Sequence, residues 1–171
     1  MTATIPVTRL AHTVLDSPVG PLTLVAVDGV LARLHMDRQR YAPDPASFGP
    51  RDDGPFAEAA RQLEGYFTGT RTEFELDLAL AGTPFQQRVW RELRAIPFGE
   101  TVSYGQLADR IGNPAASRAV GLANGRNPVG IIVPCHRVVG ADGSLTGYGG
   151  GIERKRYLLA HEQRVSGQSL L

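Results

Sequence analysis

The sequence has a single cysteine, Cys135, and this scarcity limits the chemistry that the chain can carry. One cysteine cannot close a disulfide within the chain or supply a multi-cysteine zinc site. A reducing, cytoplasmic setting is therefore the default expectation. The first half has no cysteine and only two histidines, His12 and His35, so we expect no zinc site built from cysteines and histidines there, and we expect no metal or cofactor. We expect His35, which alternates with Leu34 in a predicted strand, to lie at the surface.

Long apolar runs are also missing. No stretch of about 18 apolar residues occurs, and the N-terminal residues lack a basic segment followed by a long apolar one. We therefore expect neither a membrane span nor a secretory signal. The 171 residues, of which 42% are hydrophobic and 20% charged, fit one compact domain or two small ones that share a core.

Excess charge is small overall, because the net charge is +1, but it is unevenly distributed. Residues 1–83 carry 7 Arg against 11 acidic residues and have a net charge of −4, whereas residues 84–171 carry 11 basic against 6 acidic residues and have +5. A basic second half suggests a polyanionic partner. Ordinary surface charge also produces a difference of this size.

Residues 1–82 are predicted to form a small N-terminal α/β domain. Asp28-Gly29 separates two apolar runs and is a strong signal for a two-residue hairpin. Four prolines between residues 37 and 55 indicate a long surface loop. The predicted elements are strands near 10–16, 22–27 and 30–36, a helix at about 55–67 and a short strand at 73–79.

Residues 83–171 are predicted to form a mainly helical C-terminal domain. Thr83 with Gln86, and Ser103 with Gln106, each match the capping-box pattern that opens a helix. Asn113 is predicted to cap a third helix, and the second and third helices would then form a helix-turn-helix. A plain helical hairpin is the more common structure for such a segment taken alone. Further along we predict an apolar strand at 131–133, a helix at about 152–162 and a frayed tail at 164–171.

The stretch around Cys135 and His136 carries the chemistry. A lone cysteine is most often a small buried hydrophobe, but a neighbouring proton acceptor favours the nucleophilic thiolate. Adjacent residues in an extended chain point to opposite sides, so His136 reaches Cys135 only if the chain turns there or through a bridging water. A histidine that removes a proton needs an orienting acceptor, and Glu162 is a candidate.

The motif Pro134-Cys135-His136-Arg137-Val138 resembles the active-site motif of the O6-alkylguanine-DNA alkyltransferases. The resemblance covers most of residues 84–162 in order and spacing, whereas the first half resembles the family's variable N-terminal domain only loosely, through SPVGPLTLVA. The segments that carry it are FQQRVWRELRAIPFGETVSYGQLADRIG (85–112), ASRAVGLANGRNPVGIIVPCHRVVG (116–140) and LTGYGGGIERKRYLLAHE (145–162).

The resemblance implies an alkyl transfer from O6 of a damaged guanine to Cys135, which would be used once. It assigns His136 as a water-mediated base, Glu162 as the group that orients it, and Asn127 as the brace of the turn that holds Cys135. Tyr104 would donate a proton to the leaving guanine, and a weakly acidic phenol suits that role; without the resemblance, a surface tyrosine near a helix start is the more common case.

The resemblance also implies double-stranded DNA as the partner of a monomer. A base inside a duplex cannot present O6 to a buried thiol, so the nucleotide must flip out. Arg118 would fill the gap from a helix that enters the minor groove, although it could also be an ordinary exposed arginine. Other residues expected at DNA or guanine are Ala116 and Ser117 beside Arg118, Tyr148 against the base, Gly149 with its amide toward O6, and the Cys135 and Val138 carbonyls toward the guanine amino group.

Three alternatives are open on sequence grounds. A lesion-binding relative without transfer activity would resemble this family but lack the acceptor cysteine, which is present here. A Cys-His hydrolase would need an oxyanion hole and repeated turnover. A plain helix-turn-helix regulator does not account for the PCHRV motif.

Overall fold

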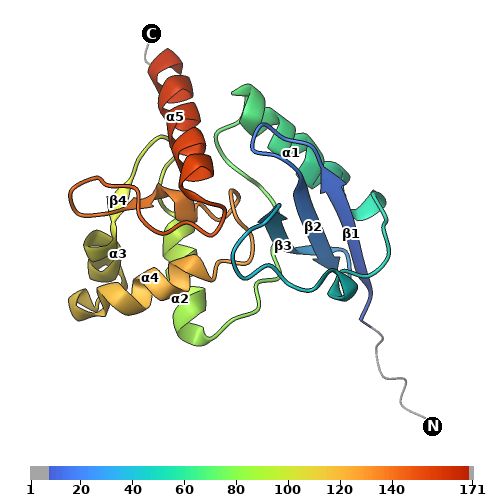
Figure 1. Cartoon of the computed structure of the whole chain (residues 1–171), viewed down its shortest axis with the longest axis horizontal. Helices are drawn as coiled ribbons and strands as arrows, with labels where there is room; N and C mark the ends of the chain where they lie inside the picture. The colour runs from blue at the N-terminus through green and yellow to red at the C-terminus, as the bar shows by residue number, and fades with distance from the viewer. Residues whose placement is uncertain (1–7, 170–171) are drawn as a thin grey trace.

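The first half of the chain is a three-stranded antiparallel sheet covered on one face by a helix (Figure 1). The structure is a computed structural model in which residues 8–169 are described. Asp28 and Gly29 both adopt left-handed backbone angles, with φ of 50° and 81°, as the predicted tight hairpin requires. The elements are β1 (Leu10–Leu15), β2 (Leu22–Val27), β3 (Val30–Met36) and α1 (Ala57–Thr68), with short 3₁₀ turns at Pro45–Ser47 and Gly54–Phe56.

The second half is mainly helical, so the predicted fold class is confirmed. Both predicted capping boxes form: Thr83 accepts from the Gln86 amide, Ser103 accepts from the Gln106 amide, and each glutamine side chain bonds back to the cap residue. The elements are α2 (Pro84–Arg94), β4 (Val102–Ser103), α3 (Tyr104–Ile111), α4 (Ser117–Gly125), β5 (Val138–Val139) and α5 (Ile152–Ser169).

Several local expectations are corrected. Residues 73–79 form no strand and make only one β-bridge, between Leu31 and Leu78. The backbone of Glu75 is hydrogen-bonded by the Gln62 side chain instead, which donates to Glu75 O and accepts from the Glu75 amide. The side chain of Asn113 caps nothing, and a 3₁₀ turn at Pro114–Ala116 precedes α4. The tail expected to fray from residue 164 is helical to Ser169, and residues 170–171 lie outside the described part.

The expectation that His35 lies at the surface is wrong. Its side chain is buried, and its ring centroid lies 5.1 Å from that of Phe48. The loop after β3 folds back beside β1, where the His12 amide donates to Pro50 O and the Asp52 amide donates to His12 O. This return of the loop covers a face of the sheet that a strand pattern alone would leave to solvent.

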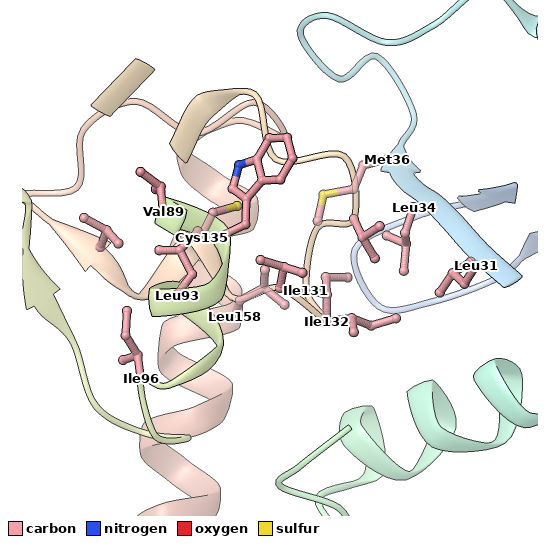
Figure 2. Close-up of a cluster of buried hydrophobic side chains, with 14 of the residues drawn as sticks. Leu31, Leu34, Met36, Val89, Leu93, Ile96, Ile131, Ile132, Cys135 and Leu158 are labelled. Carbon is pink, nitrogen blue, oxygen red and sulfur yellow. The ribbon is translucent and has the colours of Figure 1, made fainter. Parts of the chain in front are cut away.

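A single hydrophobic core joins the two halves (Figure 2). Leu31, Leu34 and Met36 of β3 approach Ile131 and Ile132, while Val89 and Leu93 of α2, with Ile96 just after that helix, pack from the other side. Backbone hydrogen bonds reinforce the contact, since the Leu34 amide donates to Pro128 O and the Gly130 amide donates to Leu34 O. The segment that leads to Cys135 is therefore held between the sheet and the helices. No helix of residues 8–169 has the length and apolar character needed to cross a membrane.

Candidate active site

Cys135 stands at the start of a tight turn. Residues Cys135–Arg137 form a 3₁₀ turn, so the chain does bend at the cysteine. The run at 131–133 is buried as expected but is not a strand, because Ile131 takes a left-handed φ of 69°. Asn127 clamps this bend: its Nδ2 donates to Val133 O at 2.7 Å and its Oδ1 accepts from the Val129 amide at 3.0 Å. A strained backbone is thus held by a buried side chain.

The Cys135 thiol is buried beside a small cavity. Burial raises the pKa of the thiol, while a hydrogen bond from Asn127 and the charge of Lys155 act in the opposite direction. The cavity has a volume of about 20 Å³, enough for about one water molecule. It is lined by Gln39, Asn124, Gly125, Asn127, Gly130, Cys135 and residues 147–150.

Glu162 lies at the centre of a buried hydrogen-bond network. Its carboxylate accepts from His136 Nε2 at 2.7 Å, from Arg137 Nε at 2.8 Å and Nη2 at 3.1 Å, from the Gly99 amide at 3.1 Å and from Tyr66 Oη at 2.7 Å. Burial alone would raise the pKa of Glu162, but the hydrogen bonds and charges of His136 and Arg137 outweigh it and hold the pKa well below its usual range. Glu162 is therefore an anion within the folded protein.

His136 is oriented by that anion. A charged Glu162 places the ring proton on Nε2, which leaves Nδ1 as the acceptor. Nδ1 is buried and receives no hydrogen bond from any described residue. Burial lowers the pKa of His136 despite the opposing effect of Glu162, so the neutral ring is favoured. A neutral imidazole with a free Nδ1, next in sequence to a thiol, can accept a proton.

Three buried residues of this site had no assigned role in the sequence reasoning. Arg137 is paired with Glu162 and also donates from Nη1 to Ile96 O at 2.6 Å. Lys155 is fully buried and donates from Nζ to Val138 O at 2.6 Å and Thr146 O at 3.0 Å. Tyr66 comes from α1 in the first half and lies 96 positions before its partner Glu162. Two signals were available in the sequence: Arg137 is adjacent to His136, and Lys155 is the only lysine in the chain. Nothing in the residues around Tyr66 pointed to its role.

Residues 147–150, three of which are glycines, line the cavity where the guanine is predicted to bind. Tyr104 Oη donates to Thr146 O at 3.1 Å, and burial raises the pKa of this phenol. Tyr148 and Gly149 line the same small cavity as Cys135, and Gly149 O accepts from the Arg40 amide at 2.8 Å. Val138 O, expected to face guanine, already accepts from Lys155. Its second lone pair is the one that a ligand would use.

The predicted DNA-contacting residues lie at the start of α4. Arg118 is exposed and forms no ion pair or hydrogen bond with the side chains that the structure describes, while Ala116 and Ser117 beside it are half-buried. One turn later Leu122 is 69% exposed, although it is a large apolar residue. A cation and an apolar side chain one turn apart are the groups that enter a minor groove and separate base pairs. Sequence reasoning missed Leu122.

Comparisons with known proteins give a consistent result over most of the chain. Residues 84–164 match the family described as 6-O-methylguanine DNA methyltransferase, DNA binding domain, and residues 10–80 match 6-O-methylguanine DNA methyltransferase, ribonuclease-like domain. The methylated-DNA–protein-cysteine methyltransferase of Mycobacterium tuberculosis is 59% identical over 149 residues, which are 87% of this chain and 90% of that protein.

A more distant relative and a solved structure agree. The methylated-DNA–protein-cysteine methyltransferase of Methanosarcina acetivorans is 46% identical over 88% of this chain and 97% of its own length. The crystal structure of Mycobacterium tuberculosis OGT in complex with DNA superimposes with a TM-score of 0.87 and 57% identity, over 91% of this chain and 94% of that one.

Proposed function

The chain belongs to the 6-O-methylguanine DNA methyltransferase family and repairs DNA by alkyl transfer, and on that premise we propose that Cys135 is the residue that accepts the alkyl group. The observation that carries this assignment is that the sequence holds one cysteine, which lies beside the cavity next to an oriented, neutral histidine. In a family that alkylates its own cysteine, no other residue of this chain can be the acceptor.

The geometry supports an in-line displacement. The Cys135 sulfur forms a bond to the alkyl carbon while the bond between that carbon and guanine O6 breaks. The thiol proton passes to His136 Nδ1 through a water. The chain bends at Cys135, but His136 Nδ1 forms no direct hydrogen bond with the thiol, so a water has to connect the two groups. Tyr104 gives a proton to the leaving guanine. His136 then releases the proton it gained to solvent and the Tyr104 phenolate takes one up, so the net change is that one proton replaces the alkyl group on the base.

Base flipping is the second part of the proposal. A cavity of about 20 Å³ does not accommodate a purine, so Tyr148 and the wall formed by Gln39 and Gly149 move aside when the flipped base enters. Arg118, with Leu122 one turn behind it, fills the gap in the duplex from the minor-groove side. Asn127 holds the turn under Cys135 throughout, and the Gly149 amide and Val138 carbonyl contact the guanine.

The partner is double-stranded DNA that contains O6-alkylguanine, bound by a monomer. A reducing compartment such as the cytoplasm suits a protein whose one thiol must stay free. The alternatives are less well supported: a non-transferring relative needs no thiol, and a hydrolase needs a site for turnover.

The test counts the labelled methyl groups that are transferred from DNA to the protein. Duplex DNA with one radiolabelled O6-methylguanine is incubated with the protein, and label on the protein is measured. We expect at most one methyl per chain and no regeneration, because a thioether is a poor leaving group. Cys135→Ser should take up none. Release of methanol with repeated turnover, or full labelling of Cys135→Ser, would contradict the assignment.

The role of Arg118 is tested by comparing two substrates. Arg118→Ala should slow repair of duplex DNA much more than reaction with the free O6-alkylguanine base, because only the duplex needs a filled gap. Arg164→Ala, a change at an exposed arginine of α5, is the matched control. Equal losses on both substrates would rule out a role in flipping.

A further inference from the structure

A groove of about 830 Å³ between the two halves is lined by five arginines. Arg33 of β3 and Arg40 of the following loop come from the first half. Arg91 and Arg94 of α2, and Arg126 directly after α4, come from the second half. All five are exposed. The first half has a net negative charge, yet it supplies two of the cations.

None of these arginines is neutralised within the described part of the protein. No carboxylate is among the described residues that line the groove, and none of the five arginines forms an ion pair or a side-chain hydrogen bond there. Arg51 and Arg61, by contrast, each pair with a nearby acidic side chain. Five cations facing one concave surface without counter-charges concentrate a positive potential, which a polyanion would relieve.

Two of the arginines also fix the wall between this groove and the thiol cavity. The Arg126 guanidinium lies 3.8 Å from the centre of the Tyr41 ring, and that of Arg40 lies 4.8 Å from it. The Arg40 amide ties the same loop to Gly149 O. Because Arg126 covers one face of the Tyr41 ring, Tyr41 is less suited to stacking on a base. The groove therefore presents positive charge at this point and not an open aromatic ring.

The groove is continuous with the site already described. Gln39, Gly125 and Asn127 line both the groove and the cavity beside Cys135. Gly125 is also the last residue of α4, the helix assigned to DNA. A strand that delivers a base into the cavity therefore has its next phosphates at the mouth of the arginine groove.

We propose that this groove binds the phosphate backbone of the lesion-carrying DNA strand where that strand leaves the base pocket. The proposal rests on the proposed function, because it takes the flipped base as its starting point. Guanidinium groups match phosphate oxygens in geometry and charge, and phosphate contacts position a protein without reading sequence. DNA is favoured over an acidic protein because DNA is already the ligand of the adjoining surface. The ribonuclease-like half thereby takes part in DNA binding through Arg33 and Arg40.

The first test measures how DNA binding depends on salt. Arg33, Arg91 and Arg94 are changed together to Gln, which leaves the Arg40–Tyr41–Arg126 contact intact. The matched control changes Arg9, Arg156 and Arg164 to Gln; these are exposed arginines outside the groove, and the loss of charge is the same. Each lost phosphate contact lowers the log–log salt slope by about 0.9. Three lost contacts predict that, between 50 and 200 mM salt, the groove variant loses about 40-fold less affinity than the control.

The second test identifies the strand. Neutral methylphosphonate linkages are placed next to the lesion, either in the lesion strand or in its complement. Neutral linkages in the lesion strand should abolish the difference between groove variant and control, and those in the complement should preserve it. The reverse pattern would overturn the assignment to the lesion strand.

A third measurement separates this proposal from the function on which it rests. Alkyl transfer from the free O6-alkylguanine base should be equal in the groove variant, the control and the unchanged protein, which also shows that all three are folded. Failure of that reaction in the unchanged protein would refute the proposed function. Equal salt slopes in variant and control would overturn the groove proposal alone. If the slopes are equal and the variant loses binding to polyglutamate, the occupant is an acidic protein.

Discussion

Removing the Tyr66 hydroxyl tests whether the first half of the chain holds the Glu162 carboxylate in place. Tyr66 Oη donates to Glu162 Oε2 at 2.7 Å, and both side chains are at most 1% exposed. Tyr66→Phe deletes this donor but leaves four others on the carboxylate. A buried hydrogen bond to a charged group contributes about 1.5–3 kcal/mol, so we expect that loss in the free energy of unfolding at pH 7.

The pH dependence of the same variant has a defined sign. The folded-state pKa of Glu162 lies below its ordinary value of 4.5, so the carboxylate contributes stability above that pH, and the contribution is lost as pH falls through the folded pKa. Tyr66→Phe removes a bond to the charged form and raises that folded pKa. The stability gap between the two proteins should be constant from pH 5 to 8 and should narrow only in acid, below the folded pKa of the variant.

The assay is urea unfolding across this pH range, with a thermal scan as a second measurement. For a chain of this size the predicted loss corresponds to about 3–12 °C in Tm. Tyr157→Phe is the matched control, because the Tyr157 hydroxyl bonds to none of the described residues. A loss below about 0.5 kcal/mol at pH 7, or one equal to that of the control, would refute the reasoning, since surface changes commonly have effects of that size.

Three further predictions concern the pocket. Because burial lowers the pKa of His136 below its usual 6.5, the rate of transfer should hold at pH 6.5 and fall only at lower pH; a rate already halved at pH 6.5 would contradict the neutral base. Methylation of Cys135 adds a methyl group beside a cavity of about 20 Å³, and overpacking should cost about 1–3 kcal/mol, so an unchanged Tm after stoichiometric methylation would count against it. Gly150→Ala should destabilise the fold by a similar amount, because its Cβ would lie 2.5 Å from Met36 Sδ and 2.8 Å from Tyr148 Cε2, whereas Gly149→Ala meets nothing closer than 3.5 Å and should be tolerated in thermal unfolding.

Features encoded by neighbouring residues could be predicted from the sequence. The Asp28-Gly29 hairpin and both capping boxes depend on residues within three positions of one another, so their patterns carry the whole cause. Asn113 shows where such reasoning fails. It has the right residue type before Pro114, but the chain enters a 3₁₀ turn first, which takes the side chain away from the amides that it would cap.

Long-range contacts could not be predicted in the same way. His35 is buried because a loop many residues later brings Phe48 across it, and no strand pattern encodes that return. The pairing of Tyr66 with Glu162 spans 96 positions and joins a residue that looks like ordinary helix core to one that looks like ordinary helix surface. The left-handed backbone of Ile131 also could not be predicted, because a β-branched residue normally avoids that conformation. The hydrogen bonds of Asn127 and the surrounding core hold the backbone in it.

The first half of the chain reaches the reacting groups at two separate places. Tyr66 holds the carboxylate behind His136, and the loop with Gln39 and Arg40 forms one wall of the cavity in front of Cys135. The helix-turn-helix half alone would leave Glu162 with one donor fewer and the thiol cavity open on one side. A buried thiol that reacts only once must be shielded until the flipped guanine enters the cavity. The wall formed by the loop with Gln39 and Arg40 therefore has a function beyond stability. The arginine groove proposed to bind DNA lies against the same loop, so on that proposal the loop that closes the cavity also lines the path of the DNA strand whose base enters it.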